Sequence, residues 1–149
     1  MNLQTYPRKR TNGRILLPKQ LSIANHCQTL ALTVAPGPCL VGLDEESWAK
    51  LEDILAKKLP LAESKELRML KRFVIGFGFE MAYPKNRYLI LPQLLRLDGI
   101  NSEEALIIDY GNRFELWDKA RYASKTQSST GEFPTTAYER LWSKILTMM

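Results

Sequence analysis

Apolar segments of strand length alternate along this chain with longer segments whose apolar residues recur at helical spacing. Six segments have the length and composition of β-strands: residues 15–17, 30–34, 40–43, 88–91, 105–108 and 114–117. Turn-forming residues at 35–38 and 109–112 separate two neighbouring pairs of these segments. We therefore expect two antiparallel hairpins, with 15–17 and 88–91 as separate short strands, each closed by a proline.

Three longer segments predict helices. Asp44 is placed to cap the first, whose apolar face carries Trp48, Leu51, Ile54 and Leu55. The second has an apolar face of Leu67, Leu70, Val74 and Phe77, and its outer face is basic, with Lys65, Arg68, Lys71 and Arg72. A capping box at 136–139 begins the third, whose apolar stripe is Tyr138, Leu141, Trp142, Ile145 and Met149. We expect this last helix to dock on the body of the protein or on a neighbouring subunit, after a polar loop at 124–134.

The two hairpins belong to an internal repeat with an offset of about 73 residues. The matching pairs are Arg14 and Arg87, Pro18 and Pro92, Asp44 and Asp118, and Trp48 and Tyr122. Each copy reads as strand, short helix, hairpin, helix. The repeat divides the chain into a first domain at 5–60, a connecting helix at 61–77, a second domain at 78–123, and a polar loop with an amphipathic helix at 124–149.

The net charge of +5 is concentrated at one end of the 149-residue chain. Residues 1–43 contain Arg8, Lys9, Arg10, Arg14 and Lys19 and no carboxylate, whereas the rest of the chain is balanced. A local excess of this kind favours an anionic partner that is met at one place. The average hydrophobic content argues against long disorder, and no apolar run has the length of a membrane span or a signal peptide, so a cytoplasmic protein is expected.

The residue types that carry catalysis do not form a recognisable pattern. Cys27 and Cys39, with His26 as the only histidine, supply too few ligands for a zinc site, and we expect buried reduced thiols and a solvated loop histidine. The carboxylates Glu103, Glu104, Asp109 and Glu115 show no paired spacing and are expected to be solvated. The glycines of 76–79 are expected to support a turn or close packing. The sequence thus predicts no enzyme activity, catalytic residue, metal, cofactor or small-molecule substrate.

The basic N-terminal segment is the strongest candidate for binding. Asn12-Gly13 is a reverse-turn signal, which would place Arg8, Lys9, Arg10 and Arg14 on the two arms of a tight hairpin. Cations at such a tip can contact phosphates and can offer a guanidinium to a guanine base. The alternative for this segment is a solvated basic hairpin. The equivalent second segment at 83–87 is less basic, and an ordinary turn there is as well supported as a binding role.

These features together resemble the MraZ family of bacterial transcriptional repressors, which are built from two AbrB-like (SpoVT-AbrB) domains. The resemblance covers residues 5–123 and rests on the repeated turn-Arg-apolar-Pro unit, on the strand that leads to Asp44 and Trp48, and on Phe114-Glu115-Leu116-Trp117-Asp118. It implies an α+β, β-rich fold in which two swapped-hairpin βαββ halves form a small barrel with flanking helices. It also implies ring-shaped homo-oligomers in the nucleoid that bind double-stranded DNA at short direct repeats upstream of division and cell-wall genes.

The signature of that family is an Asp-x-x-x-Arg loop in each half. Arg14 and Arg87 match the arginines, whereas Arg10 and Tyr83 occupy the aspartate positions and Asn86 replaces a glycine. The resemblance implies Arg14 as the main DNA contact. The full set of expected DNA-binding residues is Arg8, Lys9, Arg10, Asn12, Arg14, Lys85 and Arg87. The loss of both aspartates leaves an alternative open, an oligomeric protein-interaction module that acts through the basic helix or the C-terminal apolar stripe.

Overall fold

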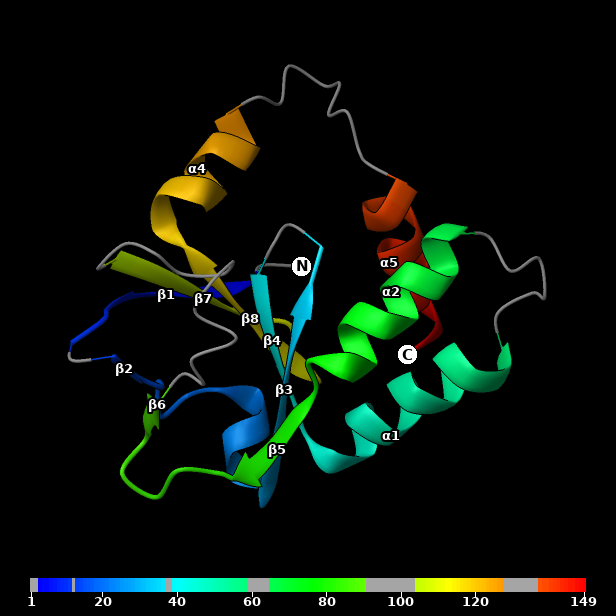
Figure 1. The fold of residues 1–149 in the computed structure, drawn as a ribbon. Coiled ribbons are helices and arrows are strands. Elements are labelled where there is room, and N and C mark those ends of the chain that lie inside the picture. Colours follow the sequence, from blue (N-terminus) through cyan, green and yellow to red (C-terminus); the bar gives the residue numbers. More distant parts are fainter. Residues whose placement is uncertain (1–2, 12, 37–38, 59–64, 91–103, 128–136) are drawn as a thin grey trace.

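The fold is a six-stranded antiparallel sheet with a second, two-stranded sheet on one side and helices on the other (Figure 1). The computed structural model describes residues 3–11, 13–36, 39–58, 65–90, 104–127 and 137–149. Its strands are β1 (Gln4–Lys9), β2 (Arg14–Leu16), β3 (Thr29–Ala35), β4 (Cys39–Leu43), β5 (Phe79–Ala82), β6 (Tyr88–Ile90), β7 (Glu104–Asp109) and β8 (Arg113–Asp118). The α-helices in these ranges are α1 (Glu45–Asp53), α2 (Lys65–Gly76), α4 (Lys119–Gln127) and α5 (Ala137–Met148).

Both predicted hairpins are confirmed. β3 pairs with β4 through Ala31↔Leu43 to Ala35↔Cys39, and β7 pairs with β8 through Ala105↔Asp118 to Asp109↔Phe114. The hairpins join edge to edge, because β4 also pairs with β8. Gly42 lies opposite Phe114 in that ladder, and a Cβ at Gly42 would stand 2.3 Å from the Phe114 ring. The glycine therefore lets the two hairpins approach closely enough to share one sheet.

The first strands of the two repeats are exchanged between the hairpins. β1, from the first repeat, pairs with β7 of the second hairpin, and β5, from the second repeat, pairs with β3 of the first. β2 and β6 pair with each other in the separate small sheet. Strands from the predicted domains at 5–60 and 78–123 therefore share both sheets.

The four central strands of the large sheet, β3, β4, β7 and β8, are buried on both faces, which is why their sequences are nearly continuous apolar runs. The edge strands β1 and β5 are largely exposed. Leu30, Leu32 and Leu40 face a cluster shared with Ile15 and Leu89 of the small sheet. The alternate residues face a second cluster on the helical side, which includes Val41, Leu43, Trp48, Leu51, Leu70, Val74, Trp117, Trp142 and Ile145. Two layers of core, one on each side of one sheet, hold the fold together.

The helices agree with the predicted periodicity. α1 begins after Asp44, whose carboxylate accepts a hydrogen bond of 2.8 Å from the Ser47 N–H, and its last turn continues as a π-helical segment, Ile54–Lys58. α5 packs on α2, so the C-terminal helix docks on the body of the same chain. One prediction was wrong: α4 extends to Gln127, so residues 124–127 are helical and not part of a loop. The capping residue Thr136 lies outside the described residues.

The α+β class is confirmed, and among the described strands the large sheet is open, with β1 and β5 at its edges. A closed barrel stays a prediction. The expectation of close packing is met at Gly78, where a Cβ would stand 2.7 Å from the Trp48 ring, but not at Gly76, where nothing lies within 4 Å. No described helix is long and apolar enough to cross a membrane.

Candidate nucleic-acid interface

The basic N-terminal segment makes the reverse turn that its sequence predicts. Thr11 and Arg14 exchange two backbone hydrogen bonds, each 3.0 Å long, across a two-residue connection. Gly13 has a φ of 74°, in the left-handed region that glycine adopts without strain. Asn12, the remaining candidate residue of this turn, lies outside the described residues. The turn places Arg14 at the start of β2, next to the end of β1.

The two arms do not continue as one hairpin. Beyond the Thr11–Arg14 pair, β1 follows β7 and β2 follows β6, so the arms separate into different sheets. The turn is therefore held by two ladders that come from the second repeat. Sequence reasoning missed this arrangement, because a two-residue turn signal says nothing about strands that lie about 70 to 105 positions away.

Arg8 bridges the two arms and is not simply presented to solvent. Its Nε donates a hydrogen bond of 2.7 Å to the Leu16 carbonyl, and its Nη1 donates one of 3.1 Å to the Pro7 carbonyl. The guanidinium also lies 5.9 Å from the centroid of the Tyr6 ring. Arg8 keeps its charge near the turn, but its geometry ties β1 to β2.

The side chains of Lys9 and Arg14 are exposed, and neither pairs with a carboxylate among the described residues. Arg10 is half-buried. Lys9 and Arg14 flank the turn from its two sides. Glu104 lies opposite Lys9 in the β1–β7 ladder but forms its ion pair with Lys119, at 3.6 Å, so the tip carries an excess of positive charge. This is the electrostatic feature that a phosphate backbone requires of its partner.

The equivalent turn of the second repeat is built differently. The Arg87 N–H donates to the Pro84 carbonyl at 3.0 Å, and the Asn86 side-chain oxygen accepts from the Tyr88 N–H at 3.0 Å. Arg87 itself has a φ of 64°, an unusual conformation for a residue with a side chain. The asparagine at the family's glycine position thus closes the turn with its own side chain.

Arg87 points back into the protein fold. Its carbonyl accepts a hydrogen bond of 2.7 Å from the Leu17 N–H, and its Nη1 donates one of 3.3 Å to the Leu17 carbonyl. These bonds extend the β2–β6 ladder by one residue. Lys85, in the same turn, is exposed. Of the two candidates in the second repeat, Lys85 is exposed. Arg87 is half-buried, and its guanidinium donates a hydrogen bond to a backbone carbonyl.

Tyr83, at the family's second aspartate position, is half-buried with its hydroxyl enclosed. Burial, with a smaller effect from Cys27, raises the pKa of Tyr83 to about 12. Burial also raises the pKa of the Cys27 thiol to about 11, helped by Asp44 and Glu45. Cys27 and Cys39 are both buried and unbridged, as predicted. A thiol with so high a pKa is a poor nucleophile at neutral pH.

Two carboxylates that were expected to be solvated are buried, and that prediction was wrong. Asp109 accepts hydrogen bonds of 2.9 Å from both the N–H and the hydroxyl of Ser22, and one of 2.8 Å from the Gly111 N–H. Glu115 accepts one of 2.9 Å from the Trp117 indole and lies 3.9 Å from Arg113. Each carboxylate is engaged by donors of the fold itself, which gives both a structural role.

His26 is exposed, as expected of a loop histidine, but it is also paired. Its Nε2 lies 2.8 Å from Asp44 Oδ2, at the N-terminus of α1. Burial alone would raise the pKa of Asp44, but the hydrogen bonds from the Ser47 N–H and from His26 outweigh burial and lower it. Across the part of the chain that the structure describes, no three His, Cys, Asp or Glu side chains gather closely enough to hold a metal ion.

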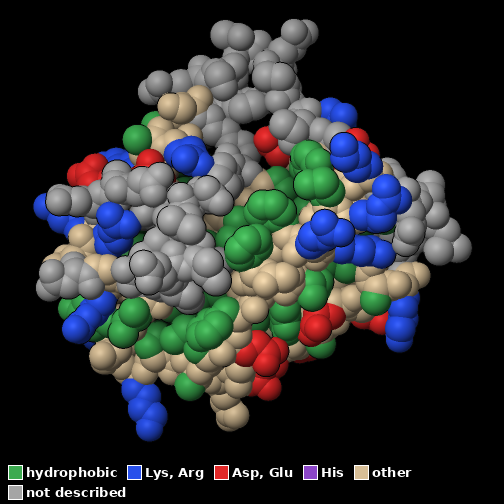
Figure 2. Space-filling model, viewed as in Figure 1, with side chains coloured by type: hydrophobic (Ala, Val, Ile, Leu, Met, Phe, Trp, Pro, Cys, Tyr) green, Lys and Arg blue, Asp and Glu red, His purple; other side chains and the backbone are tan. Residues whose placement is uncertain are grey.

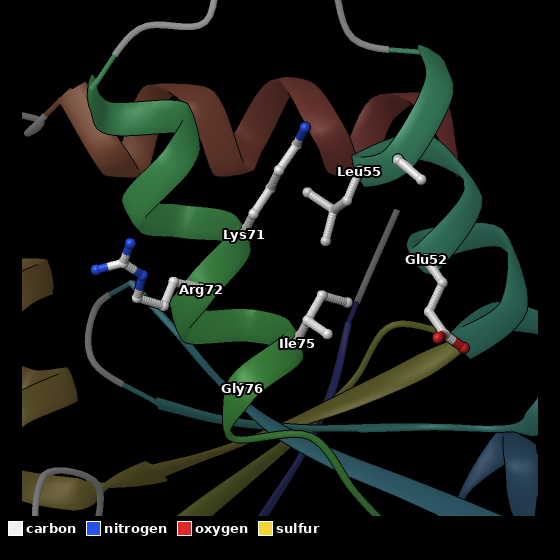
Figure 3. Close-up of a pocket in the computed structure, with 7 residues that line it drawn as sticks. Glu52, Leu55, Lys71, Arg72, Ile75 and Gly76 are labelled. Carbon is white, nitrogen blue, oxygen red and sulfur yellow. The ribbon is translucent and has the colours of Figure 1, made fainter.

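The surface of α2 carries both charge and apolar area. In Figure 2, Lys and Arg side chains gather over this helix beside hydrophobic ones. Met69, Phe73 and Ile75 are 37%, 43% and 40% exposed. Figure 3 shows Leu55 and Ile75 facing each other across a groove of about 600 Å³ between α1 with its π-helical end and α2. We call this the α1–α2 groove.

The structure is thus a β-rich α+β fold that presents two exposed cations, Lys9 and Arg14, on a tight turn. This distribution of charge suits a protein that binds an anionic partner. No family model matches the chain. Curated relatives do match: a transcriptional regulator MraZ of Shewanella amazonensis is 31% identical over 122 residues, covering 78% of each chain. The MraZ of Acidovorax sp. is 32% identical over 76% of this chain and 78% of its own. That of Treponema denticola is 29% identical over 84% of this chain and 86% of its own.

The chain belongs to the MraZ family of transcriptional regulators. The resemblance found from the sequence is thereby confirmed. The relatives carry the name of regulators and not of enzymes, in agreement with the prediction that the chain is not an enzyme.

Proposed function

We propose that the protein regulates transcription by binding double-stranded DNA through the turn at 8–14. Arg14 is the main contact, with Lys9 and Arg10 beside it and Lys85 as a secondary contact. The observation that carries the proposal is the pair of exposed cations, Lys9 and Arg14, on the two sides of a turn that is fixed by backbone hydrogen bonds. A rigid turn with unpaired charge loses little entropy when it engages a phosphate or a base edge.

We propose a supporting role for two of the expected DNA contacts. Arg8 and Arg87 each donate to a backbone carbonyl at the end of β2, Leu16 and Leu17 respectively. Their main contribution is to hold β2, and with it Arg14, in place. Their charges add to the positive field around the turn.

Following the family resemblance, we propose that several copies assemble into a ring and engage short direct repeats upstream of division and cell-wall genes, as a repressor in the nucleoid. One basic turn per subunit is a weak contact, and linkage through the ring supplies avidity. The exposed apolar side chains Met69 and Phe73, one turn apart on α2, support self-association through this helix. Phe73→Asp should then lower the mass measured by sedimentation, while Lys57→Asp, a charge change in the π-helical segment Ile54–Lys58, should leave it unchanged.

DNA containing the protein's own upstream region tests the proposal directly. At about 50 mM salt, where multi-phosphate contacts are strong, the wild type should bind, and a variant with Lys9, Arg10 and Arg14 all replaced by alanine should not. Arg8 is left in place because its removal would disturb β2. Absence of binding by the wild type at this salt concentration would overturn the proposal.

The α1–α2 groove favours a second candidate, a protein-interaction module on the same fold. Its lining combines the apolar side chains of Leu55, Ala56 and Ile75 with the charged side chains of Glu52, Lys71 and Arg72. If this candidate is correct, the triple alanine variant should retain full regulatory function in cells. Loss of function in that variant, with a normal thermal unfolding curve, would exclude it.

A further inference from the structure

A second basic feature lies between the two repeats, separate from the turn at 8–14. It is a groove of about 540 Å³ with Lys19, Asn25 and Gln28 on the side of the first repeat and Tyr83, Lys85 and Arg87 on the side of the second. We call it the inter-repeat groove. The ends of its two walls are joined by the Tyr83 N–H bond to the Gln28 carbonyl, at 2.9 Å, and by the bonds between Arg87 and Leu17.

The charges along this groove are of one sign. Lys19, Lys85 and Arg87 line it, and no described carboxylate does. Lys19 and Lys85 form no ion pair with a described residue. Asp44 and Glu45 are close enough to act on Cys27, but Asp44 is engaged by His26 and Ser47, and Glu45 accepts from the Thr29 N–H at 3.0 Å. The positive field of the groove is therefore left without a counter-charge from its own walls.

The hydrogen-bonding groups of the groove are mainly donors. Two ammonium groups and a guanidinium donate only, and the side-chain amides of Asn25 and Gln28 each offer an NH₂. Such a set of groups suits a ligand that accepts hydrogen bonds, carries negative charge and presents several oxygens.

We infer that the inter-repeat groove binds a phosphate group, held by Lys19 from the first repeat and by Lys85 and Arg87 from the second. The left-handed backbone of Arg87 and its bonds to Leu17 fix one cation in advance, and the two exposed lysines close on the ligand. The phosphate belongs either to the backbone of bound DNA or to a free phosphorylated compound. Assigning the phosphate to DNA rests on the proposed DNA-binding function, whereas assigning it to a free compound does not.

Inorganic pyrophosphate is the probe for the site itself. It is titrated into the full-length protein without DNA, and binding is measured by calorimetry and by amide chemical shifts of Asn25, Gln28 and Tyr83. Lys19→Ala and Lys85→Ala should each weaken binding about tenfold or more, since each removes a charge-assisted contact. Lys144→Ala makes the same change of charge at an exposed position of α5, and this variant should bind like the wild type. Equal affinity in all four proteins, or no binding, would overturn the inference.

DNA binding then identifies the source of the phosphate. If it is the DNA backbone, Lys19→Ala should reduce the slope of log K against log salt by about one, and pyrophosphate should compete with DNA. If it is a free compound, the slope should stay unchanged while the loss of pyrophosphate binding persists. The pyrophosphate titration needs no DNA, so it remains decisive even if the wild type binds no DNA and the proposed function fails.

Discussion

Arg8 shows how a side chain that looks like a DNA contact in sequence can have another task. Its cationic neighbours suggest a role in binding, yet its Nε donates a hydrogen bond of 2.7 Å to the Leu16 carbonyl. The β2–β6 ladder has three residue pairs, so each further hydrogen bond to β2 contributes noticeably to holding that strand in place. A sequence pattern cannot reveal this, because the acceptor is a backbone group that the fold brings near.

We expect Arg8→Ala to lower the free energy of unfolding by about 1–2 kcal/mol, through the loss of the bond to Leu16. Lys9→Ala, one residue further and exposed, should change it by less than about 0.5 kcal/mol. Chemical denaturation of the two variants and the wild type measures the difference. Equal stabilities would show that Arg8 does not hold β2.

Gly42 provides a sharper test at the scale of one residue. A Cβ there would overlap the Phe114 ring, so Gly42→Ala should destabilise the protein by about 1–3 kcal/mol or more through overpacking. Gly76→Ala is the matched control, because nothing lies within 4 Å of a Cβ at that position. Thermal unfolding should show a clear drop for the first variant and none for the second.

At the scale of elements, the hairpins and helices were predictable and their partners were not. The β3–β4 and β7–β8 hairpins follow from apolar runs around turn residues, and α1 follows from Asp44 and its helical period. The exchange of β1 and β5 between hairpins is set by long-range pairing, which leaves no local signal. Likewise, Asp109 accepts its hydrogen bonds from Ser22, which lies 87 positions earlier in the chain. Nothing near Asp109 in the sequence therefore indicated its burial.

The capping of α1 makes stability depend on acid pH. The pKa of Asp44 is lowered in the folded protein, so its stabilising contribution is complete above the ordinary value of 3.8 and is lost as the pH falls through the lowered value. Asp44→Asn removes the charge while keeping an oxygen that can cap the helix. Between pH 6 and pH 3 the wild type should lose more free energy of unfolding than this variant. An equal loss of free energy of unfolding in both proteins would show that the Asp44 carboxylate is not the source of this acid sensitivity.

At the scale of the whole molecule, the candidate site is a product of both repeats. The turn at 8–14 is local in sequence, which is why its cations could be predicted from the uneven charge of the chain. Its support is not local, since β1 and β2 pair with β7 and β6 of the second repeat. The inter-repeat groove is composite in the same way, and the sequence alone placed Lys19 in no site.

The central claim is that Arg14 presents its charge, from a fixed turn, to DNA. The most direct measurement is the affinity for the protein's own upstream DNA across a series of salt concentrations, for the wild type, Arg14→Ala and Lys144→Ala. Arg14→Ala should lose about 1–3 kcal/mol of binding free energy per engaged subunit if it reads a base, or about one unit of salt slope if it contacts a phosphate. Lys144→Ala should match the wild type. If Arg14→Ala binds with the affinity and salt dependence of the wild type, the account is contradicted.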